Sequence, residues 1–207
     1  MENLVTITLR STHYYLIDTG QGLLMVDTGW AGSLPALKSQ LKRVGIGLDQ
    51  IRYVMMTHHH PDHAGLTQEI KDASQARLII LEVQIPFLEN LKAFQAEKSV
   101  YRAIRIDASD LVLRGSNRAD LYGVGIQGEI IETPGHSDDS VSLVLDSGLA
   151  FIGDLQLPDR VRDEARQLTL ASWKKLLTLG AKTFYPGHGD PFGAEAVKKN
   201  INQISIV

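Results

Sequence analysis

The segment that most constrains this chain is a run of histidine and aspartate directly after an apolar stretch. Residues 51–57 have the composition of a buried β-strand, and they lead into His58-His59-His60-Pro61-Asp62-His63. Because side chains alternate along an extended backbone, His58 and His60 face the same side while His59 is turned away. Pro61 suits a turn from strand to helix, which places Asp62 and His63 on the first helical turn. The three imidazoles of the spacing H-x-H-x-D-H, those of His58, His60 and His63, have no good explanation as core packing.

Further candidate ligands follow other predicted strands. His136 follows Pro134 and Gly135, Asp154 follows an apolar stretch that ends at Gly153, and His188 lies between two glycines. Side chains at strand ends sit on a rigid scaffold, where functional groups tend to collect. Neutral imidazoles and carboxylates suit Zn²⁺, Fe or Mn²⁺. Since the candidates exceed the four ligands of one tetrahedral ion, we expect two divalent metals, zinc first and iron or manganese as alternatives; the candidates are His58, His60, Asp62, His63, His136, Asp154 and His188.

Composition limits the classes of protein to which the chain can belong. At 207 residues it is long enough to bury a core, and we expect a single domain over 1–207. A net charge of −3 gives no electrostatic case for nucleic acid or an anionic membrane. The absence of cysteine excludes disulfides, thiolate ligands and a thiol nucleophile. The start lacks the features of a signal peptide, and no apolar run has membrane-spanning length, so we expect a cytoplasmic protein.

Hydrophobic periodicity predicts strands that alternate with helices. This mixture favours sheets covered by helices, an α/β or α+β class, over a helical bundle or an all-β barrel. The region 99–125 has scattered apolar residues and is left unassigned. The expected strands are 5–9, 14–18, 23–27, 51–57, 77–83, 126–132, 141–145, 149–152 and 183–185, and the expected helices are 34–44, 62–74, 86–98, 168–179 and 194–201.

Five motifs in a fixed order resemble those of a known superfamily. They are Val26-Asp27-Thr28-Gly29, the run from Thr57 to His63, Thr133-Pro134-Gly135-His136, Gly153-Asp154 and Gly187-His188. The chain resembles the metallo-β-lactamase-fold hydrolases, which include glyoxalase II-like thioesterases and lactonases. The resemblance extends from about residue 5 to residue 191 and rests mainly on the histidine run.

The resemblance implies a fold and a set of ligands. The fold is a four-layer αβ/βα sandwich with the site at one edge of the sheets. One metal would be held by His58, His60 and His136, and the other by Asp62, His63 and His188. Asp154 would bridge the two, and Asp27 would form hydrogen bonds near the metal loop that fix the orientation of the ligands.

We expect a dinuclear metal hydrolase that acts on a small ester, thioester or lactone through a metal-bound hydroxide. In this interpretation Asp62 is catalytic, because it would orient the nucleophile and pass a proton to the leaving group. Two other activities use similar ligands: a metal-dependent phosphodiesterase or nuclease, and a persulfide or thiol dioxygenase with a single iron on His58, His136 and Asp154. A non-catalytic metal sensor is a further alternative. The expected partner is a small-molecule substrate.

Residues around the substrate are less constrained by the pattern. An apolar wall is expected either from a helical stripe within residues 87–94 or from Leu155 to Leu157. Arg160 is a candidate anchor for an anionic group, and His13 and Tyr14 are candidates for the pocket edge or for a plain hairpin. The chain ends sixteen residues after Pro191, where glyoxalase II has a helical extension that grips glutathione, so we do not expect a glutathione thioester.

Overall fold

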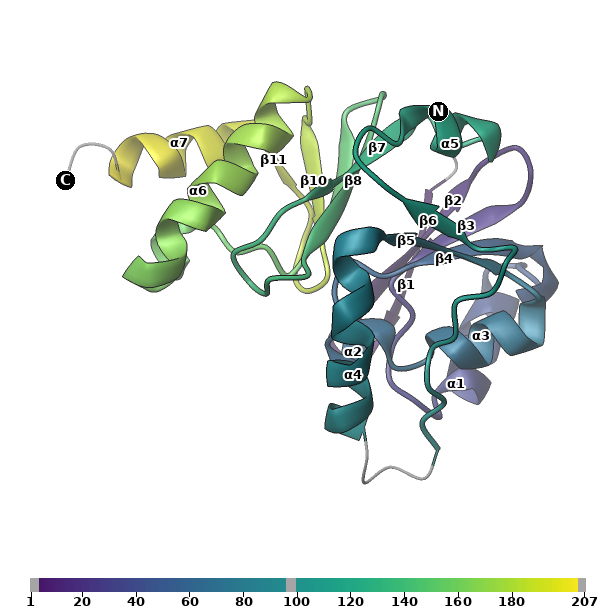
Figure 1. Cartoon of the computed structure of the whole chain (residues 1–207). Coiled ribbons are helices and arrows are strands. Elements are labelled where there is room, and N and C mark those ends of the chain that lie inside the picture. Colours follow the sequence, from purple (N-terminus) through teal and green to yellow (C-terminus); the bar gives the residue numbers. More distant parts are fainter. Residues whose placement is uncertain (1–3, 96–99, 205–207) are drawn as a thin grey trace.

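Two β-sheets lie face to face between two layers of helices (Figure 1). The structure, a computed structural model, describes residues 4–95 and 100–204. Apolar side chains form three core clusters in these residues, one between the sheets and one between each sheet and its helices. A sheet that is apolar on both faces must be covered on both, which explains the four layers. The expected αβ/βα sandwich is confirmed.

The first sheet is built from the N-terminal half of the chain. Its strand order is β1-β2-β3-β4-β5-β6, antiparallel from β1 to β3 and parallel from β3 to β6. The strands are β1 (Leu4–Leu9), β2 (Thr12–Asp18), β3 (Leu23–Val26), β4 (Ile51–Met55), β5 (Arg77–Leu81) and β6 (Leu111–Leu113). Since β3 and β4 are parallel, the residues that follow them emerge at the same edge of the sheet.

The second sheet has the order β11-β10-β9-β8-β7. Its strands are β7 (Gly128–Glu132), β8 (Val141–Leu145), β9 (Leu149–Gly153), β10 (Thr183–Pro186) and β11 (Phe192–Gly193). Only β9 and β10 are parallel, so their carboxyl ends also meet at one edge. The amide of Val141 donates a hydrogen bond to the carbonyl of Thr57 at 2.8 Å, which ties this sheet to the end of β4.

Helices cover the outer face of each sheet. Those on the first sheet are α1 (Leu34–Arg43), α2 (Pro61–Ala64), α3 (Thr67–Ser74) and α4 (Leu88–Gln95), with 3₁₀ turns η1 (Leu48–Gln50) and η2 (Glu82–Phe87). The second sheet is covered by α6 (Asp163–Thr178) and α7 (Ala194–Ile204), with η3 (Pro158–Arg160) before α6; α5 (Arg118–Gly123) packs at the end of the inter-sheet core through Leu121. In the described parts of the chain, no helix is long and apolar enough to cross a membrane.

Several predicted boundaries are wrong, and the structure gives a physical reason for two of them. The helix expected over 62–74 is split, because the amide of Leu66 donates to the carbonyl of Gly29 at 2.7 Å and leaves the helical pattern. The strand expected over 23–27 ends at Val26, because Asp27 has a left-handed φ of 59°. The helix expected over 168–179 begins earlier, at Asp163, and Leu168 is an exposed residue within it.

The region that the sequence left unassigned, 99–125, contains β6 and α5. A buried lysine holds the segment that leads to β6 in place. Lys71, 5% exposed, donates to Asp110 at 2.6 Å, to Asp107 at 3.2 Å and to the carbonyl of Arg105 at 2.7 Å. A buried ammonium needs such partners. Helix α3 thereby holds the irregular segment that leads to β6.

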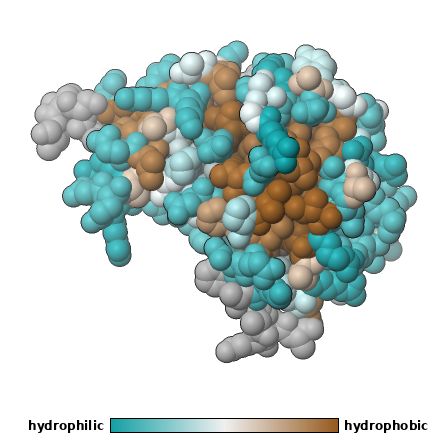
Figure 2. Space-filling model, viewed as in Figure 1, coloured by the Kyte–Doolittle hydropathy of each residue, from teal (hydrophilic) through white to brown (hydrophobic). Residues whose placement is uncertain are grey.

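Two residues of the apolar stripe expected over residues 87–94 pack into the core. Leu91 is fully buried and Leu88 packs against the same cluster, while the side chain of Phe94 lies outside the described residues. Figure 2 shows an apolar, brown area in the middle of this face, next to α4. Leu88 and Ile104 are partly buried residues that pack against the cluster between the first sheet and its helices. The core interpretation of Leu88 and Leu91 is therefore the correct one.

Candidate metal centre

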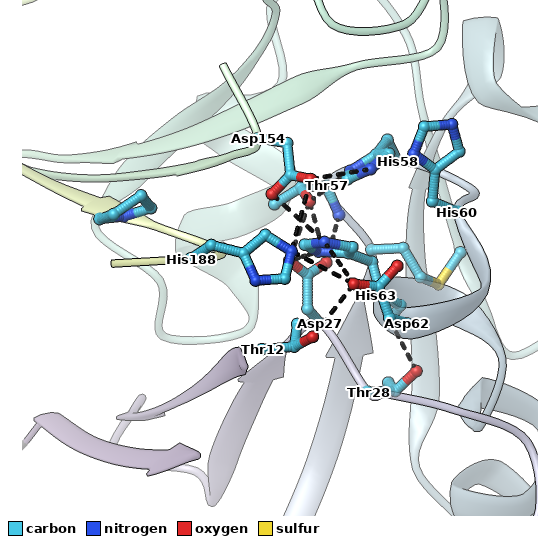
Figure 3. A network of polar contacts seen from close by, with 12 residues as sticks. Thr12, Asp27, Thr28, Thr57, His58, His60, Asp62, His63, Asp154 and His188 are labelled. Atoms are coloured by element: carbon cyan, nitrogen blue, oxygen red, sulfur yellow. Dashed lines mark hydrogen bonds and ion pairs between the residues drawn. The ribbon is translucent and has the colours of Figure 1, made fainter. Parts of the chain in front are cut away.

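The candidate ligands meet where the two sheets come together (Figure 3). The end of β4 leads into His58 and His60, and α2 carries Asp62 and His63. Across the gap, the loop between β7 and β8 supplies His136, while Asp154 and His188 follow the parallel strands β9 and β10. All seven side chains expected as ligands therefore lie in one place. Three overlapping groups of these residues have ligand atoms within 4.8 Å of one another: His58, His60 and His136; His58, His63 and Asp154; and Asp62, His63 and His188.

The distances divide the cluster into two halves around Asp154. In one half, His60 Nδ1 lies 3.0 Å from His136 Nε2. In the other, Asp62 Oδ2 lies 3.2 Å from His188 Nε2 and 3.6 Å from His63 Nε2.

Asp154 contacts both halves. Its Oδ2 lies 3.6 Å from His136 Nε2, 3.6 Å from His188 Nε2 and 4.0 Å from His58 Nε2, and its Oδ1 lies 3.3 Å from His63 Nε2. This is the arrangement expected of a carboxylate shared by two cations.

Unpartnered buried atoms test whether these residues fit a metal. His58 Nε2, His63 Nε2 and Asp154 Oδ1 are buried without a hydrogen-bond partner, and all three belong to the cluster. Buried polar atoms are nearly always satisfied, so a group of orphaned lone-pair atoms that converge needs another partner. A divalent cation satisfies imidazole nitrogen and carboxylate oxygen together. The residues present therefore fit a metal.

Asp27 links the histidine run to the cluster from behind. It is 1% exposed, and its Oδ1 accepts hydrogen bonds from the amide of Thr57 at 2.7 Å and from its hydroxyl at 3.0 Å. Its Oδ2 accepts from His63 Nδ1 at 2.8 Å. With the proton held on Nδ1, the Nε2 lone pair of His63 faces the cluster. This is the geometry expected for an outer carboxylate that orients a ligand.

Asp139 was not among the predicted site residues, yet it supports the same loop. Its Oδ2 accepts hydrogen bonds from the amide of His59 at 2.7 Å and from its Nδ1 at 2.6 Å. The buried Gln84 donates to the carbonyls of Met56 at 3.1 Å and Asp139 at 3.3 Å. His59 is therefore a structural residue that points away from the cluster, as the alternation of side chains predicts. The sequence feature that could have indicated this role of Asp139 is the position of its carboxylate, three residues after His136 in the same loop.

Burial and charge move the pKa values of the cluster in different directions. Burial lowers the pKa of His58 well below its usual value, and the neighbouring imidazoles lower it further. Burial also lowers the pKa of His136. Burial would lower the pKa of His63 as well, but Asp27 and Asp154 raise it to about 10. Burial raises the pKa of Asp154, whereas its contacts with His63 lower it overall. Neutral imidazoles and ionised carboxylates are the forms that bind metal, and a cation beside Asp154 would take the place of the proton on His63.

Two glycines let the backbone come close to the ligands. A Cβ on Gly153, whose φ is 53°, would collide with Thr57 Oγ1. A Cβ on Gly187 would collide with the His63 ring and lie 2.7 Å from Asp154 Oδ1. The glycines of the Gly153-Asp154 and Gly187-His188 motifs are therefore required by space at the site.

A cavity of about 510 Å³ opens beside Asp154 and His188. Its wall includes the apolar side chains of Leu155, Leu157 and Phe192, and Arg160 lies at its lining. Leu155 and Leu157 belong to the segment after Asp154, which is one of the two segments expected to supply an apolar wall. His13 and Tyr14, which were candidates for the pocket edge or for a plain hairpin, are not among the residues that line this cavity. Tyr14 is buried, and His13 Nε2 donates to the carbonyl of Gly189 at 2.9 Å.

Comparison with known proteins agrees with this geometry. The chain is 32% identical over 191 residues to the beta-lactamase-like protein 2 homolog of Caenorhabditis elegans, covering 88% of this chain and 57% of that protein. It is 33% identical over 156 residues to a hydroxyacylglutathione hydrolase of Cereibacter sphaeroides, covering 73% of this chain and 51% of that enzyme. The chain thus spans little more than half the length of these relatives.

Solved structures show the same fold at lower identity. A metallo-beta-lactamase family protein from Thermus thermophilus superposes with a TM-score of 0.72 at 21% identity, over 99% of this chain and 78% of that one. The family model of the metallo-beta-lactamase superfamily matches residues 7–188, which contain all the motifs of the site. The chain therefore belongs to the metallo-beta-lactamase superfamily.

Proposed function

We propose that this protein is a metal-dependent hydrolase that uses two divalent metal ions, zinc in the first instance, to cleave a small ester, thioester or lactone. The observation that carries the proposal is the convergence of unpartnered His58 Nε2, His63 Nε2 and Asp154 Oδ1 in one buried cluster. When bound, such ions lower the pKa of water to about 7 and polarise a substrate carbonyl. The C. sphaeroides relative is named for hydrolysis of hydroxyacylglutathione, an acyl thioester, which favours carbonyl chemistry.

The chain's own residues have separate tasks in this proposal. His58, His60 and His136 hold one ion, Asp62, His63 and His188 hold the other, and Asp154 lies between them. Asp62 is half-buried and has one oxygen turned to the imidazoles of His63 and His188. From this position its carboxylate would orient the attacking water and carry a proton to the leaving group.

The cavity beside Asp154 gives the acyl group a place to bind. Leu155, Leu157 and Phe192 offer an apolar wall, and the exposed Arg160 lies where it could contact an anionic end of the substrate. The volume of about 510 Å³ is in the range of sites for small ligands. We therefore propose a small-molecule substrate with a compact apolar acyl part.

A matched panel of substrates tests the proposal. Purified protein, stripped of metal and reloaded with zinc, manganese or iron, would be assayed on aryl esters, lactones, acyl thioesters, a phosphodiester and RNA. Metal-dependent cleavage of at least one carbonyl substrate is expected, and His58→Ala should abolish it. Arg118→Ala, a change on α5, is the control and should cleave at the wild-type rate.

Other outcomes point to the alternative activities. A kcat/KM for the phosphodiester or RNA well above that of every carbonyl substrate would contradict hydrolysis of esters and favour a phosphodiesterase. Oxygen consumption with a thiol or persulfide in the iron-loaded protein, without hydrolysis, would favour a dioxygenase. Metal binding without any turnover would favour a sensor.

A further inference from the structure

The turn between β1 and β2 lies against one half of the metal cluster. Thr12 Oγ1 donates a hydrogen bond to Asp62 Oδ2 at 3.0 Å, and the carbonyl of Ser11 accepts one from His188 Nδ1 at 2.7 Å. Arg10, with a φ of 59°, closes the turn that presents these two groups. Two ligands that are 126 positions apart in the chain are thus held by adjacent residues of one hairpin. Figure 3 shows Thr12 joined to Asp62 by a dashed line.

The hydrogen bond from Thr12 reaches the oxygen that matters for a metal. Asp62 Oδ2 is the atom that lies 3.2 Å from His188 Nε2 and 3.6 Å from His63 Nε2. Thr12 is 1% exposed, so its hydroxyl has little water to bind instead. A shielded hydrogen bond to a carboxylate is stronger than one between neutral groups. Thr12 therefore fixes the rotation of the Asp62 carboxylate.

The Ser11 carbonyl fixes His188 in a complementary way. A carbonyl can only accept, so the proton of His188 lies on Nδ1. The lone pair of His188 is then on Nε2, which faces Asp62 and Asp154. A backbone partner of this kind sets both the tautomer and the plane of a ligating ring.

The hairpin is itself locked to the loop that carries His188. The amide of His13 donates to the carbonyl of Gly187 at 2.8 Å, and His13 Nε2 donates to that of Gly189 at 2.9 Å. Thr8 Oγ1 donates to His13 Nδ1 at 2.8 Å, which holds the ring in this tautomer. The loop is bracketed on both sides of His188, so the hairpin and the ligand form one rigid unit.

The other half of the cluster is supported from elsewhere. His58 contacts Thr57 and Asp154, and His136 contacts His60 and Asp154. These supports come from the end of β4 and from the second sheet. A change in the hairpin should therefore act on one half of the cluster and spare the other.

We propose that Thr12 is a positioning residue that sets the affinity of the metal held by Asp62, His63 and His188, independently of the metal held by His58, His60 and His136. The inference rests on the proposed two-metal function. It goes beyond that function because it assigns control of one metal to the β1–β2 hairpin, outside the seven ligands.

Cobalt titration of the metal-free protein tests this. Co²⁺ is added to wild type, Thr12→Val and Thr12→Ser, and binding is followed by visible absorption and calorimetry. Two binding steps are expected, one for each half of the cluster, and the step that His188→Ala removes belongs to the half with Asp62. Thr12→Val keeps the branched shape but removes the hydroxyl, and it should weaken that step by about 10- to 100-fold, the usual effect of losing an outer partner. The other step should stay within about 2-fold. Thr12→Ser, which retains the hydroxyl, should stay within about 3-fold of wild type on both steps.

Thr6→Val is the matched control, since Thr6 is exposed on β1 of the same hairpin. It should bind both ions as wild type does. If Thr12→Val is unfolded by circular dichroism, Thr12→Ala takes its place, because its smaller side chain cannot clash with the buried surroundings.

Three results would overturn the inference. Unchanged affinity of both steps in the variant without the hydroxyl would show that Thr12 does not position Asp62. Equal weakening of both steps would show a general structural role of the hairpin. A single binding step in wild type would refute the two-metal function together with the inference. The first two results, obtained with two binding steps in wild type, would refute the inference alone.

Discussion

Asp27→Asn is the change whose consequences the structure defines best. The carboxylate accepts hydrogen bonds from Thr57 through Oδ1 and from His63 Nδ1 through Oδ2. An amide has one oxygen instead of two. If that oxygen remains on Thr57, the amide NH₂ faces the Nδ1–H of His63, and two donors oppose each other.

The expected loss of unfolding free energy follows from the hydrogen bond between Asp27 and His63 that the substitution removes. One hydrogen bond to a charged group is worth about 1.5–3 kcal/mol, and Asp27 is 1% exposed, so water cannot replace it. The free energy of unfolding of the metal-free protein should fall by about that amount. His63 can escape the clash by moving its proton to Nε2, but this blocks the nitrogen that faces the cluster. The affinity of the metal beside Asp62 should therefore fall by about 10- to 100-fold as well.

Urea denaturation of the metal-free protein and Co²⁺ titration measure the two effects. Asp120→Asn, at an exposed position on α5, is the control for the chemical change and should leave both quantities unaltered. An unfolding free energy of Asp27→Asn within about 0.5 kcal/mol of wild type, the usual scatter of a surface substitution, together with unchanged affinity for both metals, would contradict this role of Asp27.

Four further outcomes are expected. Asp62→Asn should lower kcat by about 10²–10⁴-fold while the metal in the other half is retained, as shown by metal analysis and steady-state kinetics. Gly187→Ala drives a methyl into the His63 ring and should abolish binding of one metal in a Co²⁺ titration, whereas Gly123→Ala meets open space and should not. Addition of zinc to the stripped protein at about 100 times its Kd should raise the unfolding free energy by about 2.7 kcal/mol. Burial raises the pKa of Asp139, but its hydrogen bonds with His59 lower that pKa overall below its usual value. The carboxylate therefore stabilises the fold at neutral pH, and this stabilisation is lost as the pH falls through the lowered pKa, so Asp139→Asn should flatten the acid limb of a stability profile.

The ligand geometry could be foreseen where it depends on local backbone rules. His58 and His60 share a side because they lie on extended chain, and Pro61 starts the turn that carries Asp62. His136, Asp154 and His188 were marked by their place after apolar strands. Such signals act over a few residues, so a sequence read for period and turn chemistry contains them. The superfamily itself was confirmed, whereas the ligand roles stay a prediction.

The supporting contacts could not be foreseen, because they join segments far apart in the chain. Nothing near Thr12 indicates that its hydroxyl lies 3.0 Å from Asp62, and nothing near Gln84 indicates contact with Asp139. The break after Gly65 has the same origin, since the amide of Leu66 bonds to Gly29 across the sheet edge. These distances depend on which strands pair and in which register, and the sequence of one strand does not determine its pairing partner.

Anomalous diffraction from crystals of the zinc-loaded protein tests the two-metal centre most directly. We predict two zinc peaks per chain, one bounded by His58, His60 and His136 and the other by Asp62, His63 and His188, with the carboxylate of Asp154 between them. Well-occupied peaks at other places, with the carboxylate of Asp154 turned away from both groups of ligands, would contradict the metal centre and the function proposed from it.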